Sequence, residues 1–167
     1  GFGPEYWRQC AQDGAYPEAF VDAMAKAGWL AALIPEEYGG AGLPLLDACL
    51  ILQEINQNGG SAVHCHAQMY TMASIMRHGS EAQKRRTLPR ILSGEWTGTM
   101  CLTEPHCGSD LGLLRTRAEP VGDGSYHLSG TKIFITAGEH DLSKNIVHLV
   151  LARLPDAPAG TKGISMF

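Results

Sequence analysis

Ile91-Leu-Ser-Gly-Glu-Trp-Thr-Gly-Thr-Met-Cys-Leu102 is the stretch at which the periodicity of the sequence changes. Before it, from Pro17 onward, apolar residues recur at the three- and four-residue spacing of helices, with glycine- or proline-marked joints between the segments. After it, the period shortens to that of β-strands separated by turns. The sequence therefore predicts an α+β protein with an all-helical domain over residues 1–93. An antiparallel, β-barrel-like domain is expected to follow over residues 94–167.

Four helices are predicted in the first half, and residues that favour helix ends bound them. Pro17 suits the first turn of a helix, and the hydroxyl of Ser61 can cap another. Ser80 followed by Gln83 matches a capping box. Three glycines in the four positions 39–42 predict a loop there. The predicted helices cover about residues 17–29, 44–56, 61–79 and 80–89.

Five β-rich runs are predicted in the second half. Gly122, Asp123 and Gly124 supply a tight turn between two of them. The last strand pattern begins just before the sequence stops, so the sheet is expected to be incomplete and the chain to be a fragment. The predicted strands cover residues 97–102, 115–120, 125–136, 146–154 and 161–167.

Composition narrows the class of protein. The 167 residues are 44% hydrophobic, and 13 lysines and arginines face 17 acids, so the net charge of -4 argues against a nucleic-acid partner. No apolar run approaches the roughly 20 residues of a spanning helix, so membrane insertion is not expected. No secretory signal is visible, and the five cysteines form an odd set without a CxxC pair. These features predict a cytoplasmic protein with reduced thiols.

The segment Leu102-Thr-Glu-Pro-His-Cys-Gly-Ser-Asp-Leu111 is dense in hydroxyls and acids. Thr103 and Ser109 can hydrogen-bond a polar ligand, and Gly108 lets backbone amides approach an anion such as a phosphate. An ordinary turn, in which Glu104 accepts local backbone hydrogen bonds, explains the same residues. Both interpretations remain open on the chemistry of the residues alone.

A second candidate segment is Gly130-Thr-Lys-Ile-Phe-Ile-Thr-Ala-Gly138. Strand alternation places Phe134 and Thr136 on one face of a sheet, so a planar cofactor could stack on the ring and hydrogen-bond the hydroxyl. An exposed sheet face with a single phenylalanine is the alternative.

Four motifs follow one another along the chain: Pro35-Glu-Glu-Tyr-Gly-Gly, Cys101-Leu-Thr-Glu-Pro-His-Cys-Gly-Ser-Asp, Gly130-Thr-Lys-Ile-Phe-Ile-Thr and Gly163-Ile-Ser-Met-Phe. In this order they resemble the acyl-CoA dehydrogenase family over nearly the whole chain. Gly138-Glu-His-Asp-Leu and Pro158-Ala-Gly-Thr-Lys-Gly resemble its bacterial subgroup that includes 3-methylmercaptopropionyl-CoA dehydrogenases.

The resemblance implies an N-terminal helical domain, a middle β domain and FAD as cofactor. Carried over by motif position, Thr103 meets the pyrimidine edge of the flavin and Thr136 meets its N5. Ser109 meets the pyrophosphate and is also a candidate substrate contact. Phe134 stands where the family usually has tryptophan, and Met100 where an aromatic residue is common. The remaining candidate cofactor contacts are Leu102, Gly108 and Ile135.

The reaction that the resemblance implies is α,β-dehydrogenation of an acyl-CoA thioester to 2-enoyl-CoA. A carboxylate removes the α-proton, the β-hydride passes to flavin N5, and an electron-transfer flavoprotein reoxidises the flavin. The family's base is a glutamate of a C-terminal domain, which is expected after Phe167, so no catalytic residue is assigned in this chain. Glu104 is interpreted as an acceptor that braces its turn. The resemblance also implies a homodimer or homotetramer.

Two alternative functions remain open. A relative of the acyl-CoA oxidases would use the same flavin cradle but pass electrons to oxygen. A binding or interaction module of the same fold would have no turnover. The row Met69, Met72 and Met76 could line an acyl chamber, although core packing explains it without a ligand.

Overall fold

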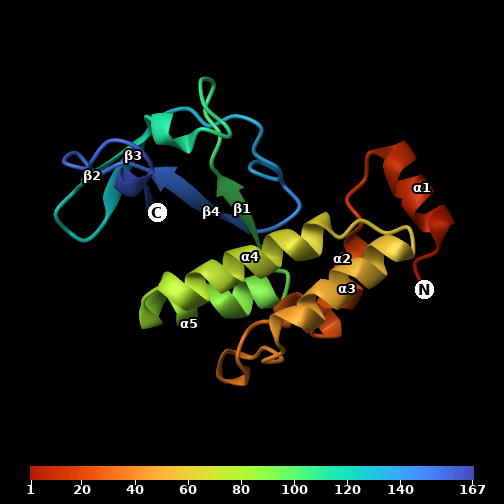
Figure 1. Ribbon diagram of the computed structural model, residues 1–167. Helices are drawn as coiled ribbons and strands as arrows, with labels where there is room; N and C mark the ends of the chain where they lie inside the picture. The colour runs from red at the N-terminus through yellow and green to blue at the C-terminus, as the bar shows by residue number, and fades with distance from the viewer. The chain divides into compact units, whose positions relative to one another are not determined.

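The computed structural model describes all 167 residues (Figure 1). The chain forms two compact units, one of residues 1–98 with 140–147 and one of residues 99–139 with 148–167. Five α-helices lie in the first unit, and the strands form two small sheets that do not close into a barrel. The predicted α+β class is confirmed. The predicted domain boundary at residues 93 and 94 stays a prediction, because compactness does not show that either unit folds alone.

Four of the five helices match the predicted ones. α5 begins with the capping box that the sequence predicts: the Gln83 amide donates to Ser80 Oγ at 3.3 Å, and the Ser80 amide donates to Gln83 Oε1 at 2.8 Å. The predicted cap of α4 is wrong, because Ala62 rather than Ser61 is its N-cap residue, and no side chain caps this helix. The helices are α1 (Pro4–Asp13), α2 (Glu18–Lys26), α3 (Leu45–Gln57), α4 (Val63–His78) and α5 (Glu81–Leu92).

The sequence prediction missed one helix and ended another too early. α1 was not predicted. It contains no fully buried residue, but its Tyr6 and Trp7 pack against the cluster around Phe20, so the helix has an apolar face that the sequence prediction missed. α5 continues through Pro89 to Leu92, where a helix end was predicted. Leu88 and Ile91 on this helix are fully buried, so packing outweighs the missing backbone donor of proline.

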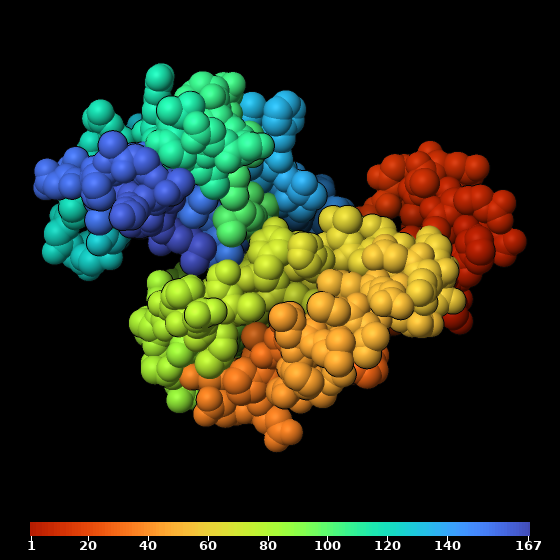
Figure 2. Space-filling view, in the orientation of Figure 1, coloured from red at the N-terminus to blue at the C-terminus, as the bar shows by residue number.

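The core of the helical unit surrounds α4. Met72 is fully buried in a cluster with Ile34, Leu88 and Ile91, and Met69 packs in a second cluster with Ala48 of α3. This confirms core packing for these two methionines. α3 lies at the surface of the unit in Figure 2, where its orange and yellow atoms face the viewer, and Ala48 is its single buried residue.

The predicted loop at residues 39–42 is confirmed, and it makes a very close backbone contact. A Cβ added to Gly40 would lie 2.0 Å from the carbonyl oxygen of Ile34, so only glycine fits there. The same oxygen accepts a hydrogen bond from the Gly42 amide at 2.8 Å. Tyr38, which directly precedes the loop, donates its hydroxyl to Glu81 Oε2 at 2.8 Å and so ties the loop to the start of α5.

Four of the five strands are shorter than the sequence predicts, and β1 has the predicted length. β2 pairs antiparallel with β3, and Gly122 and Gly124 between them have positive φ, as a tight turn requires. The second sheet has the order β1-β4-β5, with β4 and β5 antiparallel. The strands are β1 (Trp96–Cys101), β2 (Arg117–Pro120), β3 (Tyr126–Ser129), β4 (Asn145–Ala152) and β5 (Ser165–Met166).

The expectation of a strand through residues 130–136 is wrong. β3 ends at Ser129, and Phe134 has a φ of 57°, outside the β region. The alternation that placed Phe134 and Thr136 on one sheet face therefore does not apply. The cause is tertiary: hydrogen bonds from Thr99 Oγ1 to the Thr136 carbonyl and from the Ile133 amide to the Thr103 carbonyl hold this segment along the chain at residues 99–103.

No helix in the chain has both the length and the apolar character that a membrane crossing demands.

Candidate functional site

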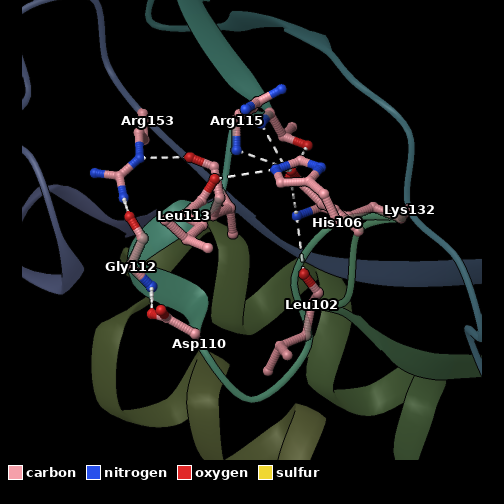
Figure 3. A network of polar contacts seen from close by, with 11 residues as sticks. Leu102, His106, Asp110, Gly112, Leu113, Arg115, Lys132 and Arg153 are labelled. Atoms are coloured by element: carbon pink, nitrogen blue, oxygen red, sulfur yellow. Dashed lines mark hydrogen bonds and ion pairs between the residues drawn. The ribbon is translucent and has the colours of Figure 1, made fainter.

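Glu104 is the centre of a polar network in the β unit (Figure 3). Its side chain is 2% exposed, and Oε1 lies 3.0 Å from Lys132 Nζ. The Thr116 amide donates to Oε1 at 2.9 Å, and the Thr116 hydroxyl donates to the same oxygen. The Arg115 amide donates to Oε2 at 2.8 Å. A buried carboxylate with this set of donors is held ionised in one position.

The turn that carries Glu104 is built by the local sequence. The Glu104 amide donates to the Cys107 carbonyl at 2.9 Å, and the Cys107 amide donates back to the Glu104 carbonyl at 3.1 Å. Pro105 at the tip fixes its own φ, which suits a tight turn. The Glu104 carboxylate is an acceptor of hydrogen bonds, as the sequence interpretation expected. The donors to its carboxylate come from residues 115, 116 and 132, however, so the bracing is not local as the ordinary-turn interpretation expected.

The environment of Glu104 changes its acidity. Burial alone raises the pKa of a carboxyl group, but the hydrogen bonds from Thr116, Arg115 and Lys132 outweigh this effect and hold the pKa of Glu104 at about 2. The folded-state pKa lies below that of the unfolded chain. The network therefore stabilises the fold at neutral pH, and this contribution is lost as the pH falls from about 4.5 toward 2.

We expect the stability of the protein to depend on pH through this group. The difference in free energy of unfolding between the wild type and Glu104→Gln is largest above pH 5 and shrinks by roughly 1.4 kcal/mol per pH unit as the pH falls from about 4.5 toward 2. Denaturant unfolding of both proteins between pH 3 and pH 7 measures it. Glutamine does not titrate, so the two curves of unfolding free energy against pH should converge at low pH. Curves that stay parallel between pH 3 and pH 7 would contradict the low pKa of Glu104.

Lys132 joins the two motif segments. Its Nζ donates to the Leu102 carbonyl at 3.1 Å as well as to Glu104 Oε1, and Figure 3 shows the side chain directed at Leu102. The Ile133 amide donates to the Thr103 carbonyl at 3.0 Å. The segments at residues 102–104 and 132–133 are thus fixed to each other. Sequence reasoning missed Lys132, because nothing in the local pattern pairs residues that lie 28 positions apart.

Three predicted contact residues present hydroxyl groups that make no hydrogen bond to the chain. These are Thr103, Ser109 and Thr136, and the latter two are exposed. Asp110, next to Ser109, accepts a local hydrogen bond from the Gly112 amide at 3.2 Å. The hydroxyls are therefore open to a ligand, and their role stays a prediction.

The other predicted contacts lie in different settings. Phe134 is 90% exposed, in the left-handed region of φ. Ile135 is half-buried, and its Cγ2 would touch a Cβ added to Gly138. Gly108 leaves room for a side chain, since its nearest neighbour, Thr103 Cγ2, would be 3.6 Å from an added Cβ. Met100 and Leu102 are half-buried, at the end of β1 and just after it.

A group of metal-type donors also lies in the turn. Ligand atoms of Glu104, His106 and Cys107 lie within 4.8 Å of one another. The Lys132 ammonium already forms an ion pair with the Glu104 carboxylate, with Nζ 3.0 Å from Oε1. Its positive charge would repel a metal cation bound to the same carboxylate. The group therefore does not suit a metal ion.

The helical unit carries the match that defines the class of protein. Residues 4–95 match the family described as acyl-CoA dehydrogenase, N-terminal domain. The chain belongs to the acyl-CoA dehydrogenase family, which confirms the resemblance seen in the sequence.

Individual relatives extend the match beyond the helical unit. The chain is 47% identical over 155 residues to 3-methylmercaptopropionyl-CoA dehydrogenase of Ruegeria pomeroyi, covering 90% of this chain and 26% of that protein. The solved structure of butyryl-CoA dehydrogenase from Megasphaera elsdenii is 32% identical with a TM-score of 0.79, over 93% of this chain and 41% of that one. A glutaryl-CoA dehydrogenase from Mycobacterium smegmatis in complex with FADH2 is 34% identical with a TM-score of 0.73, over 89% and 36%. The chain thus spans about a quarter of the length of the Ruegeria protein.

Proposed function

We propose that the protein to which this chain belongs is an FAD-dependent acyl-CoA dehydrogenase that converts an acyl-CoA thioester to its 2-enoyl-CoA. The observation that carries the proposal is the 47% identity to a named dehydrogenase over 90% of the chain. The proposal assigns residues 1–93 to the helical domain and residues 94–167 to an incomplete flavin-binding domain. Cytoplasmic location, a homo-oligomeric state and an electron-transfer flavoprotein as acceptor belong to the same proposal.

The chemistry of the candidate residues fits FAD. A flavin needs hydrogen-bond donors along its heteroatom edge and apolar contact at its face, and the unpaired hydroxyls and the exposed Phe134 ring offer both. In this proposal Thr103 and Thr136 bind the ring system and Ser109 the pyrophosphate. Bound FAD supplies the hydride acceptor for the β-carbon.

Glu104 is excluded as the base that removes the α-proton. A general base needs access to substrate and a pKa near the working pH. Glu104 is buried, its pKa is about 2, and both of its oxygens accept hydrogen bonds. We therefore place the base outside residues 1–167, in the part of the family's length that this chain does not cover.

The test is anaerobic titration of the full-length protein with acyl-CoA. We expect a yellow protein whose flavin absorbance bleaches, and Thr136→Val is expected to slow the bleaching by roughly 10- to 100-fold through the loss of one hydrogen bond at the reactive edge. Thr131→Val is the matched control, since Thr131 is exposed and has no side-chain partner.

Three outcomes separate the alternatives. Equal rates for the two threonine variants would contradict the role of Thr136. A yellow protein that no acyl-CoA bleaches indicates a flavin-binding module without turnover. Rapid reoxidation of the reduced protein by oxygen indicates an acyl-CoA oxidase instead.

A further inference from the structure

Residues 140–145, which we call the strap, contain the end of the motif Gly138-Glu-His-Asp-Leu, and no proposed flavin contact lies in them. The strap is fastened at one end to the start of β1. There the Lys144 amide donates to the Glu95 carbonyl at 3.1 Å, and the Lys144 ammonium lies 3.4 Å from Glu95 Oε1. The other end is held by a histidine.

This histidine, His140, belongs to a chain of hydrogen bonds whose directions are determined. The Leu142 amide donates to His140 Nδ1 at 3.2 Å, so the imidazole is neutral and carries its proton on Nε2. Nε2 lies 3.3 Å from Thr97 Oγ1 and therefore donates to it. Ser143 Oγ donates its single proton to the Asn145 carbonyl at 3.0 Å, so the Thr97 hydroxyl donates to Ser143 at 3.0 Å. Both hydroxyls donate and accept.

A second proton on His140 breaks this arrangement. The added proton sits on Nδ1, which then faces the Leu142 N–H, so two donors meet without an acceptor between them. Histidine ordinarily gains this proton between pH 8 and pH 5. The strap is therefore held at neutral pH and released as the pH falls.

The charged and titratable groups around His140 permit this response. His64, in the first turn of α4, interacts electrostatically with His140. Burial, and next the charge of His140, lower the pKa of His64, so His64 gains its proton at a lower pH than an ordinary histidine does. Glu139 and Asp141, which flank His140, are exposed carboxylates that favour a positive charge on it. β1 contributes the uncharged Thr97.

A second histidine close by responds to a proton in the opposite way. His148 Nε2 lies 2.7 Å from the Gly138 carbonyl, which only accepts, so the histidine is the donor. A protonated imidazole still donates from Nε2. Acid therefore leaves the hydrogen bond of His148 intact and removes the acceptor at His140.

The strap continues the segment that carries the candidate flavin contacts. Three residues separate His140 from Thr136. Phe134 and Ala137, with φ of 57° and 55°, are the non-glycine residues of the chain with positive φ, and both lie in this segment. Such a conformation is strained in a residue with a Cβ and persists where neighbouring contacts hold it. Loss of the strap contacts lets the strained segment relax.

We propose that His140 is a positioning residue: its neutral imidazole holds the strap on β1 and so keeps Phe134 and Thr136 in place for the flavin, and a second proton releases both. The link to the flavin rests on the proposed function, whereas the release of the strap does not. In this way acid weakens the hold of the protein on its cofactor.

The first test measures the strap itself by hydrogen–deuterium exchange of the full-length protein, followed by mass spectrometry of peptides that cover residues 139–147. After correction for intrinsic exchange, we expect protection to fall by roughly tenfold or more from pH 8 to pH 5, because release takes up one proton. In His140→Asn the side-chain oxygen accepts from an amide two residues on but does not titrate, so its protection is expected to be independent of pH.

His148→Gln is the matched control. Its side-chain amide still donates to the Gly138 carbonyl, so its protection is expected to follow that of the wild type. If His140→Asn does not fold, Thr97→Val removes the acceptor of Nε2 and is expected to lower protection already at pH 8. No fall in the wild type, an equal fall in His140→Asn, or full protection of Thr97→Val at pH 8 would each overturn the proposal.

The second test measures release of flavin from the FAD-loaded full-length protein by the rise of flavin fluorescence. We expect the dissociation rate to increase by roughly tenfold from pH 8 to pH 5.5 in the wild type and in His148→Gln, and by less than roughly twofold in His140→Asn. Equal pH dependence of the three proteins would overturn the positioning role of His140. A protein that binds no FAD at any pH, with strap protection that still depends on His140, would overturn the proposed function and leave the strap switch standing.

Discussion

Glu104→Gln is expected to lower the free energy of unfolding by about 3–5 kcal/mol, the largest loss from a single substitution in the β unit. Glutamine keeps the shape of the side chain but removes the charge that the Lys132 ammonium faces at 3.0 Å. It also places an NH2 group, which is a donor, where the Arg115 and Thr116 amides need an acceptor. An uncompensated buried ammonium and unpaired backbone amides are both costly.

Chemical denaturation at pH 7 measures the loss, and Glu119→Gln is the matched control. Glu119 is an exposed glutamate of β2 with no hydrogen bond or ion pair of its side chain, so its substitution is expected to change stability by less than about 0.5 kcal/mol. Similar values for the two variants would show that the Glu104 network contributes no more than a surface carboxylate.

Gly40→Ala is the second substitution with a large expected effect, about 3 kcal/mol or more. The added Cβ would lie 2.0 Å from the carbonyl oxygen of Ile34, a backbone atom that cannot turn away as a flexible side chain can. The Ile34 side chain is 1% exposed, in the cluster with Met72 and Leu88, so displacing it disturbs the core of the helical unit.

Gly3→Ala is the control for this substitution. Gly3 has a φ of -75° and no atom within 4 Å of an added Cβ, so alanine is tolerated there. Thermal unfolding of both variants compares them. A midpoint for Gly40→Ala close to that of the control would mean that the loop relaxes without cost.

The helices were predictable because their signals are local. The capping box at Ser80 and Gln83 works within one turn, and the apolar spacing that carries Met69 and Met72 has the period of a helix. α1 was missed although it has an apolar face of the same kind, with Tyr6 and Trp7 packed against Phe20.

The candidate site was predictable only in part. Motif positions pointed to Thr103, Ser109 and Thr136, whose hydroxyls are unpaired. The strand expected through Phe134 does not form, because hydrogen bonds to residues 99 and 103 hold the segment instead.

The sequence by itself determined the helix-to-strand change after Gly94, the α+β class and the family, because these depend on periodicity and on short ordered motifs. The tertiary structure alone decided that Lys132 joins Glu104 and that Arg117 lies opposite Arg153. Both contacts join residues far apart in the chain, and a charged side chain finds its partner only after the backbone has folded. The burial that strengthens the ion pair and the closeness of the two arginines are properties of packing, which no local pattern encodes.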